Sequence, residues 1–402
     1  MINLDRFIAE KIVKRPLGLL KEDLEKFDTQ LRERINGRSV LVIGGAGTIG
    51  SSYIRAILKF KVKRLYVVDI NENGLTELVR DLRSSVGFII PDDFKTYPMN
   101  FGDPVFEKMF VNEGPFEIVA NFAAHKHVRS EKDEYSIEAM IENNVLRAKK
   151  LLELLLKHKP EHFFCVSTDK AANPVNIMGA SKKLMEEVIM AYSGTLPITT
   201  ARFANVAFSN GSLPQGFLER YNKRQPWSCP SDVKRFFVSP LESGQICLMA
   251  SILGNSGDIF FPKLDMINDM QPFTMIVDAL LKEYGMKPGL CKTEEEARQK
   301  ALLLNEKSDS YPVYYFSSDT SGEKPYEEFY TESETLDMTT FPNLGVVKNT
   351  KARSIEEIEA IFSELRSLFS HGTTKAGLVE ALKKILPNFE HIETGKNLDQ
   401  KM

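Results

Sequence analysis

The residue types best suited to proton transfer lie in the segment Ser167-Thr168-Asp169-Lys170, and a second lysine, Lys182, follows 12 positions after Lys170. A hydroxyl, a carboxylate and an amine in adjacent positions can orient a substrate oxygen and move protons to and from reacting atoms. The spacing lets the two lysines converge on one site. The structural alternative is that Thr168 and Asp169 cap a helix while Lys170 points to solvent.

A glycine-rich turn earlier in the chain is suited to holding a pyrophosphate. Val40-Leu41-Val42-Ile43 predicts a buried strand, and Gly45, Gly47 and Gly50 match the pattern G-x-G-x-x-G at the start of a helix. Glycines permit the tight turn and let backbone N–H groups and the helix N-terminus face the phosphates. The segment predicts a dinucleotide-binding site; the alternative is a glycine turn without a ligand.

The end of the second predicted strand favours NAD over NADP. Asp69 lies 19 residues after Gly50, and no Arg or Lys lies between Asp69 and Val79. A carboxylate here can accept hydrogen bonds from both adenosine ribose hydroxyls and would repel a 2′-phosphate. The alternative is that Asp69 only caps the following helix.

Residues after the other predicted strands complete the expected cofactor site, because ligands in such sheets lie beyond the carboxyl ends of the strands. Lys126 either meets cofactor or substrate oxygens or points to solvent. His125 and His127 lack a third metal ligand, so we expect no metal. The residues expected to bind the cofactor at the glycine turn and these strand ends are Gly44, Gly47, Thr48, Ile49, Gly50, Asp69, Asn71, Asn100, Phe101, Ala123, Ala124, Lys126 and Ser167. Asn144 and Lys182, which lie within predicted helices, complete the expected set.

Short apolar runs alternate with helical patterns from Ser39 onward. This alternation predicts an α/β fold with a Rossmann-like doubly wound parallel sheet. Strands are expected near 39–44, 64–69, 95–99, 116–121, 162–167 and 197–203. Helices are expected near 21–31, 48–60, 72–83, 103–112, 134–158, 176–193, 213–223, 351–370 and 374–386.

Composition excludes several classes of protein. The net charge of −3 over 402 residues gives no sign of nucleic-acid binding. No apolar run approaches the ~20 residues that span a bilayer, and the N-terminus lacks the basic start and apolar core of a signal peptide. The four cysteines show no C-x-x-C pair. We therefore expect a soluble cytoplasmic protein without a membrane span.

Several ordered motifs between about residues 38 and 345 resemble the extended short-chain dehydrogenase/reductases. Within that family they resemble the polysaccharide-biosynthesis branch, the UDP-N-acetylglucosamine 4,6-dehydratases. Besides the glycine turn, the motifs are AAHKHV at 123–128, STDKA at 167–171, M-x-x-x-K at 178–182, RFANVAFSNGS at 202–212, RFF at 235–237 and DTSGEKPYEE at 319–328.

The sequence departs from the family pattern in three places. The tyrosine of the Y-x-x-x-K motif is Met178, although some members of the branch resemble this chain in having methionine there. Arg147 stands where the pattern usually has glycine. Long members carry membrane helices ahead of the dehydratase domain, and only a short arm precedes the first strand here.

The resemblance implies a 4,6-dehydratase that uses NAD as a catalyst. The hydride leaves C4 and returns to C6, and the intervening ketone lets water leave across C5–C6. Lys170 is expected to be the C5 base, provided that burial beside Lys182 and the cofactor lowers its pKa, and Asp169 the acid, provided that its pKa is raised in the same closed site. Thr168 should bind the C4 oxygen, and Lys182 the nicotinamide ribose.

The resemblance also implies a nucleotide-sugar substrate and a domain division. The expected substrate residues are Lys126, Met178, Asn205, Gly211, Ser212, Arg235, Lys263 and Glu323, with Arg235 on the diphosphate. The expected units are an N-terminal helical arm (1–37), the NAD-binding Rossmann domain (38–204), a smaller C-terminal sugar-nucleotide lobe with Rossmann elements interleaved (205–345), and C-terminal helices and tail (346–402).

Two other functions remain open. A C4 or C5 epimerase acting on the same substrate would use the same ketone and base without losing water. A catalytically silent NAD-binding regulatory module would keep the cofactor and do no chemistry. The choice between UDP and GDP also stays open, because no base-reading residue stands out. The helices expected at 134–158 and 176–193 are long enough for a four-helix homodimer contact like that of the family.

Overall fold

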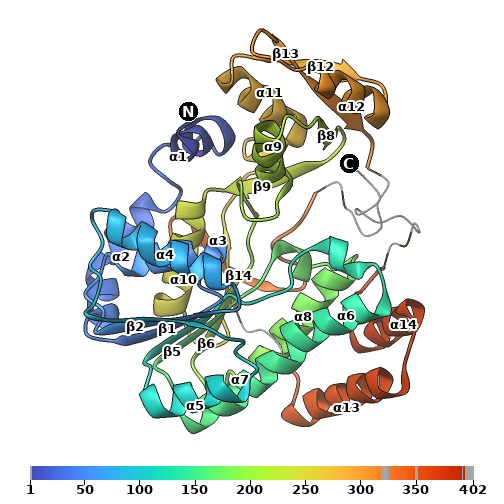
Figure 1. The fold of residues 1–402 in the computed structure, drawn as a ribbon. Coiled ribbons are helices and arrows are strands. Elements are labelled where there is room, and N and C mark those ends of the chain that lie inside the picture. Colours follow the sequence, from blue (N-terminus) through green and yellow to red (C-terminus); the bar gives the residue numbers. More distant parts are fainter. Residues whose placement is uncertain (1, 319–323, 325, 349–351, 392, 394–402) are drawn as a thin grey trace.

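A nine-stranded sheet forms the centre of the molecule (Figure 1), in the order β14-β15-β10-β6-β5-β4-β1-β2-β3. The computed structural model describes residues 2–318, 324, 326–348, 352–391 and 393. The strands that stand between β10 and β3 in this order, both included, run parallel to one another. β15 is antiparallel to its two neighbours, β10 and β14. The strand order reverses direction between β1 and β4, the place where open α/β sheets bind ligands.

The predicted strands are confirmed. β1 has five buried residues in a row, as expected for a parallel strand covered on both faces. The bounds are β1 (Ser39–Ile43), β2 (Arg64–Asp69), β3 (Asp93–Pro98), β4 (Ile118–Asn121), β5 (His162–Val166), β6 (Ile198–Ala201), β10 (Ile259–Pro262), β14 (Thr335–Asp337) and β15 (Leu344–Lys348). The last three come from far along the chain, so the later part of the sequence completes the Rossmann sheet.

Helices cover both faces of this sheet (Figure 1). On one side lie α2 (Lys21–Ile35), α3 (Thr48–Ile57), α4 (Glu72–Ser84) and α10 (Pro240–Leu253). On the other lie α5 (Pro104–Glu113), α7 (Arg147–Lys157) and α8 (Ile177–Ala191), with α6 (Glu134–Ile141) leading into α7. At Gly244 a Cβ would overlap the carbonyl oxygen of Ser52, so α10 approaches α3 closely.

The helix predicted over 134–158 is present as unbroken helical backbone from Glu134 to Lys157, but it contains a π-helical turn that the sequence did not predict. This turn, η3 (Glu142–Leu146), lies between α6 and α7. Asn144 lies in this turn, and its amide hydrogen-bonds the backbone of His125 and the hydroxyl of Ser181. Such turns commonly occur near functional sites, because the extra residue redirects a side chain.

A smaller lobe lies beyond the carboxyl ends of the central strands. It contains two three-stranded sheets, β11-β9-β7 and β12-β13-β8. Their strands are β7 (Asn205–Val206), β8 (Trp227–Pro230), β9 (Lys234–Val238), β11 (Met270–Pro272), β12 (Lys287–Cys291) and β13 (Ser310–Phe316). The helices of the lobe are α9 (Leu213–Asn222), α11 (Phe273–Glu283) and α12 (Glu294–Leu302). Its apolar core is separate from that of the main sheet and is centred on Trp227.

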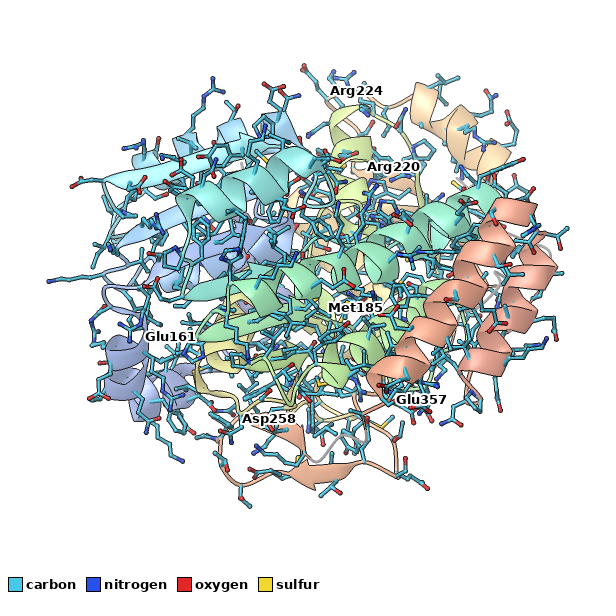
Figure 2. All side chains as sticks on the ribbon, turned by 90° about the horizontal axis from the view of Figure 1, so that it is seen from below. Glu161, Met185, Arg220, Arg224, Asp258 and Glu357 are labelled. Atoms are coloured by element: carbon cyan, nitrogen blue, oxygen red, sulfur yellow. The ribbon has the colours of Figure 1, made fainter. Side chains whose placement is uncertain are left out.

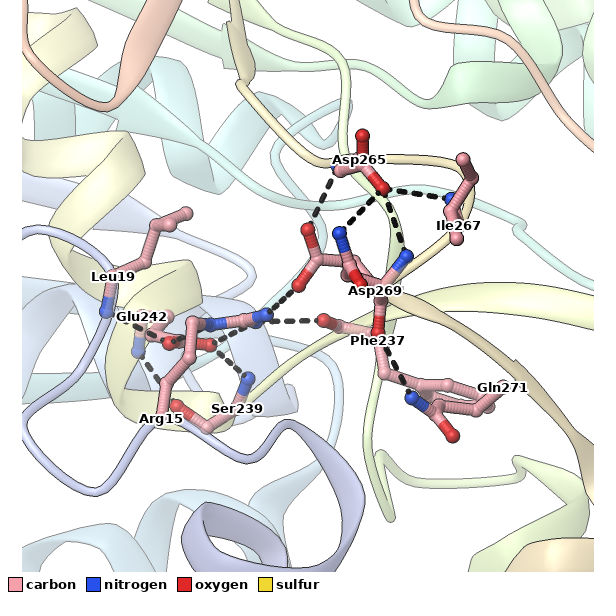
Figure 3. Close-up of polar contacts among 10 residues, drawn as sticks. Arg15, Leu19, Phe237, Ser239, Glu242, Asp265, Ile267, Asp269 and Gln271 are labelled. Carbon is pink, nitrogen blue, oxygen red and sulfur yellow. Dashed lines mark hydrogen bonds and ion pairs between the residues drawn. The ribbon is translucent and has the colours of Figure 1, made fainter.

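The N-terminal segment joins the two cores. The short helices α1 (Leu4–Phe7) and η1 (Ile8–Ile12) pack into the core of the lobe, whereas α2 packs into the main core. Arg15, which lies between them, donates hydrogen bonds to Glu242, Asp269 and the carbonyl of Phe237 (Figure 3). Glu242 is fully buried, so this contact ties the arm to α10 and to the lobe.

The C-terminal helices α13 (Ile355–His371) and α14 (Lys375–Ile385) lie alongside α8 and α6 (Figures 1 and 2). Arg353, just before α13, pairs with Glu187 of α8 at 2.5 Å, and Glu359 of α13 pairs with Lys149 of α7 at 2.9 Å. Within this one chain, therefore, α13 and α14 cover part of the helical surface that the expected homodimer would use.

The described part of the chain contains neither a membrane-spanning helix nor a cluster of metal ligands. No described helix is both long and apolar enough to cross a membrane. In the same residues, no three His, Cys, Asp or Glu side chains gather in a way that could hold a metal ion.

Candidate active site

The glycine turn brings the backbone of β1 against that of β4. Gly44 has a φ of +77°, and a Cβ there would lie 2.5 Å from the backbone nitrogen of Ala123. A Cβ on Gly50 would overlap the carbonyl oxygen of Gly44. Glycine is therefore required at both positions, once for the left-handed backbone and once for the close approach of α3.

A cavity of about 240 Å³ opens beside this turn, at the carboxyl ends of β1, β2 and β4. The predicted cofactor residues that line it are Gly44, Gly47, Thr48, Ile49, Gly50, Asp69, Asn71, Asn100, Phe101, Ala123, Ala124 and Lys126. Asn143 and Asn210 also line it and were not predicted. Asn143 belongs to the unpredicted π turn, and Asn210 comes from the segment 207–212, far from the glycine turn in sequence.

Asp69 lies at the end of β2 with its carboxylate facing the glycine turn. One oxygen accepts a hydrogen bond from the backbone N–H of Ala46 at 2.9 Å, and the other from that of Asn71 at 2.9 Å. The cap of α4 is Asn71, whose side chain accepts from the N–H of Gly74. Asp69 is therefore not the capping residue, and its carboxylate stays at the cavity edge where a ribose can meet it.

Three predicted cofactor residues lie behind the cavity lining. Asn144 holds the loop at His125, as described above. The hydroxyl of Ser167 donates to the carboxylate of Glu186 at 2.6 Å. The ammonium of Lys182, only 4% exposed, donates to the carbonyl oxygen of Val166 at 2.6 Å, and burial lowers the pKa of this lysine. All three side chains thus hold the ends of β4 and β5 in place.

The predicted catalytic residues gather at the end of β5. The hydroxyl of Thr168 donates to Asp169 Oδ1 at 2.8 Å, and Lys170 Nζ donates to the same oxygen at 3.1 Å. Thr168 also begins the short 3₁₀ turn η4 (Asp169–Ala171), and the separate cap of α8 is Asn176. Asp169 is 3% exposed. Thr168 therefore caps a short helical turn and, at the same time, belongs to a hydrogen-bonded cluster with Asp169 and Lys170.

The condition placed on Lys170 as a base, a pKa lowered by burial, is not met in this structure. Burial does lower the pKa of Lys170, but the nearby carboxylates of Asp169 and Glu327 outweigh burial and raise it. Glu327 Oε1 lies 3.8 Å from Lys170 Nζ and comes from the connection between β13 and β14. Sequence reasoning missed this contact, although Glu327 lies in the recognised motif at 319–328.

A buried ionic network lies next to the loop that follows β5. Arg202, at the end of β6, is fully buried and pairs with Glu186 at 2.8 Å and Glu334 at 2.9 Å. Burial raises the pKa of Glu186, but the Arg202 guanidinium outweighs this effect and lowers it. Because Ser167 bonds Glu186, the network links the loop after β5 to α8, β6 and the segment before β14.

Met178 lies at the N-terminus of α8, where its backbone N–H donates to Glu131 Oε1 at 2.8 Å. The Met178 side chain is 3% exposed. Burial raises the pKa of Glu131 to about 7, against the opposing effect of the N–H groups of Met178 and Ile177. Glu131 is a second buried carboxylate that the sequence pattern did not reveal.

The other predicted substrate residues have different surroundings. Lys126 is exposed at the rim of the cavity, and partial desolvation by the surrounding protein lowers its pKa. Among the described residues its ammonium has no hydrogen-bond or ion-pair partner, so it can receive an anion. Asn205 begins β7, and Ser212 caps α9. Gly211 has a φ of +75° and lies against the ring of His127.

The side chains of Arg235 and Lys263 donate hydrogen bonds to backbone carbonyls. Arg235, 7% exposed, donates to the carbonyls of Lys234 and Lys324, and its charge acts on both Lys170 and Glu327. Lys263 donates to three carbonyls of the segment 338–342, so its N–H groups hold that segment and are not open to a substrate. Glu323 lies outside the described residues.

Comparison with known proteins identifies relatives along most of the chain. Residues 40–349 match the family model described as "Polysaccharide biosynthesis protein". The chain is 30% identical over 316 residues to "Uncharacterized membrane protein MJ1061" of Methanocaldococcus jannaschii, covering 77% of this chain and 85% of the relative. It is 28% identical over 325 residues to "Probable polysaccharide biosynthesis protein EpsC" of Bacillus subtilis, covering 80% of this chain. The match spans 49% of EpsC, about half its length.

Solved structures share the fold. "X-ray structure of Pen from Bacillus thuringiensis" superposes with a TM-score of 0.64 at 20% identity, covering 80% of this chain and 91% of Pen. DesIV, a dTDP-glucose 4,6-dehydratase from Streptomyces venezuelae solved with NAD and TYD bound, gives 0.53 at 17% identity, covering 70% and 88%. These findings show that the chain belongs to the polysaccharide biosynthesis protein family of extended short-chain dehydrogenase/reductases.

Proposed function

We propose that this protein is a 4,6-dehydratase that acts on a nucleotide-activated N-acetylhexosamine, with UDP-N-acetylglucosamine as the first choice, and produces the 4-keto-6-deoxy sugar. One observation carries the proposal: Thr168, Asp169 and Lys170 form a connected hydroxyl–carboxylate–amine cluster at the end of β5. The cluster follows a strand of the same sheet edge at which the cofactor cavity opens.

The cavity residues suit NAD. Gly47 to Gly50 present the N-terminus of α3 to a pyrophosphate, Lys126 supplies a cation, and Asp69 supplies the carboxylate for the ribose hydroxyls. NAD held by these residues would supply the hydride acceptor for C4 and the hydride donor for C6. The carboxylate of Asp69 disfavours the 2′-phosphate of NADP, because like charges at this distance repel.

The cluster divides the proton transfers among its members. Thr168 hydrogen-bonds the C4 oxygen and passes the C4 hydroxyl proton to Asp169, the partner of its own hydroxyl. Lys170 removes the C5 proton once C4 is a ketone. Asp169 then protonates the departing C6 hydroxyl, so that water leaves. Lys182 holds the end of β5 through Val166 and places its positive charge below the site.

Incubation of the purified protein with a panel of nucleotide N-acetylhexosamines, followed by mass and NMR analysis, tests this function. The expected product has lost one water molecule and carries a C4 ketone. An epimerised sugar of unchanged mass would identify an epimerase instead. Protein that retains NAD and converts none of the sugars would indicate the regulatory module.

The Lys170→Met variant tests the assignment of the base. Without the amine, water loss and the entry of solvent deuterium at C5 should both stop, whereas NAD binding should persist because Lys170 does not line the cofactor cavity. Exchange is followed by mass spectrometry in deuterium oxide, and bound NAD is measured after denaturation. Undiminished turnover in this variant would exclude Lys170 as the base.

A further inference from the structure

Glu327 is a buried carboxylate that shares the Lys170 ammonium with Asp169. Its side chain is 5% exposed, and its Oε1 lies 3.8 Å from Lys170 Nζ, while the same ammonium hydrogen-bonds Asp169 at 3.1 Å. The two carboxylates come from distant parts of the chain, one after β5 and the other in the connection from β13 to β14. Only the tertiary fold places them around one lysine.

The charges around Glu327 define the resting state of the cluster. Burial raises the pKa of Glu327, Asp169 raises it further, and Lys170, Arg235 and Lys324 lower it, with a net rise. The pKa of Lys170 is raised above its ordinary value, as described above. The resting lysine is therefore an ammonium and cannot take a proton from C5. Protonation of the Glu327 carboxylate costs less free energy at this buried position than it would at the protein surface.

We propose that Glu327 is a positioning residue that accepts the proton of Lys170 when the substrate enters, leaving Lys170 as the neutral amine that the elimination requires. This inference rests on the proposed dehydratase function. An N–H bond of Lys170 breaks and an O–H bond forms on Glu327, so an ion pair becomes a neutral pair. Displacement of water by the sugar favours this change, because desolvation penalises the charged form of both groups.

The protons balance over the cycle. Lys170 takes the C5 proton; the C5–H electrons form the C5–C6 double bond as the C6–O bond breaks, and Asp169 supplies the proton of the departing water. When the hydride returns to C6, the ammonium of Lys170 protonates C5 and becomes an amine again. Glu327 then returns its proton to Lys170, which restores the resting ion pair.

The titration of Lys170 tests the coupling without any substrate. Wild type, Glu327→Gln and the control Glu328→Gln are acetylated with acetic anhydride across a pH series, and the Lys170 peptide is quantified by mass spectrometry. Glu328 is the exposed neighbouring carboxylate and pairs with Asn173 and Lys324. Loss of the Glu327 carboxylate should lower the pH midpoint of Lys170 acetylation by about 1 pH unit or more, because a nearby opposite charge raises a lysine pKa. Glu328→Gln should leave it unchanged.

Turnover separates a proton-exchange role from a structural one. Glu327→Gln should lower kcat about 10²-fold and slow deuterium entry at C5 equally, with KM within about twofold of wild type and with bound NAD unchanged. Glu327→Asp keeps the carboxylate and should recover part of kcat. If Glu327→Gln does not fold, Glu327→Asp takes its place in both experiments. The pH midpoint of Lys170 acetylation should then fall by less than is expected for Glu327→Gln.

The outcomes are distinguishable. An unchanged Lys170 midpoint in Glu327→Gln, or an unchanged kcat, overturns this inference whether or not dehydratase activity is found. A purely structural role would instead lower the melting temperature, NAD content and kcat together. A wild-type protein that converts no nucleotide sugar refutes the proposed function, and the substrate-free titration would still report whether Glu327 controls the charge of Lys170.

Discussion

In the proposed mechanism single residues at the strand ends carry the chemistry, and Asp69 is the residue proposed to select NAD over NADP. Replacing Asp69 with Ala should weaken NAD binding by about 1–3 kcal/mol, because charge-assisted hydrogen bonds to the ribose are lost. Isothermal titration of the cofactor-free protein measures the change, and Glu77→Ala on the exposed face of α4 is the control. Release of NADP from the denatured wild-type protein would contradict the role given to Asp69.

The residue in the tyrosine position has no titratable proton. Met178 is buried, and a thioether accepts hydrogen bonds only weakly, so Met178→Leu should change stability and turnover little. Asp169→Asn should lower turnover by ~10²–10⁴-fold, since it removes a group that accepts and donates protons. Both variants are compared at saturating substrate, with circular dichroism as the check on folding. A dead Met178→Leu beside a nearly normal Asp169→Asn would refute the proposed proton route.

At the scale of elements, the Arg202 network connects β6, α8 and the loop that follows β5. Arg202→Met would leave Glu186 buried without its partner, so the free energy of unfolding should fall by about 3–5 kcal/mol. Urea denaturation measures the loss, and Arg298→Met, at an exposed pair on α12, is the control. A loss no greater than that of the control would show that the network contributes nothing to stability.

The same network predicts the direction of a pH effect. Because the pKa of Glu186 is depressed in the folded state, its contribution is complete above the ordinary glutamate value of 4.5 and is lost as the pH falls below it. Wild type should therefore lose stability on acidification more steeply than Arg202→Met. Denaturation at pH values on both sides of 4.5 checks this expectation; equal slopes for the two proteins would contradict it.

At the scale of the whole molecule, the N-terminal arm connects the two apolar cores. Arg15→Ala should lower the free energy of unfolding by about 3–5 kcal/mol, because Glu242 is fully buried and would lose its guanidinium partner (Figure 3). Arg6→Ala, at an exposed pair in the same arm, should have little effect. Thermal unfolding compares the two; equal melting temperatures for both variants would show that the arm packs without this contact.

The homodimer expected from the family also belongs to this scale. In this chain, α13 and α14 lie on α8 and α6, and the ion pairs of Arg353 and Glu359 attach them there. The helical surface suggested for a dimer is thus partly occupied within one chain. The oligomeric state stays a prediction, and sedimentation of the purified protein would measure it.

Local patterns were sufficient for the parallel sheet and for the cofactor cavity. Alternating apolar runs predicted the strands from β1 to β6, because a buried parallel strand needs an uninterrupted apolar segment. The glycine turn and the strand ends then had to meet at one edge of the sheet, since all parallel strands end on the same side. The positions of Gly44, Asp69 and Ala123 followed from chain order alone.

The charges around Lys170 come partly from its sequence neighbour Asp169 and partly from Glu327, which only the tertiary structure brings close. Burial of Lys170 by itself lowers its pKa, as expected, but the net shift is set by which charges surround it, and Glu327 arrives from a distant connection. Two other contacts likewise depend on the folded chain. Lys263 donates hydrogen bonds to backbone carbonyls of the distant segment 338–342. The π turn directs Asn144 to the loop at His125. Electrostatic interaction depends on distance in space, and distances between remote segments exist only in the folded chain.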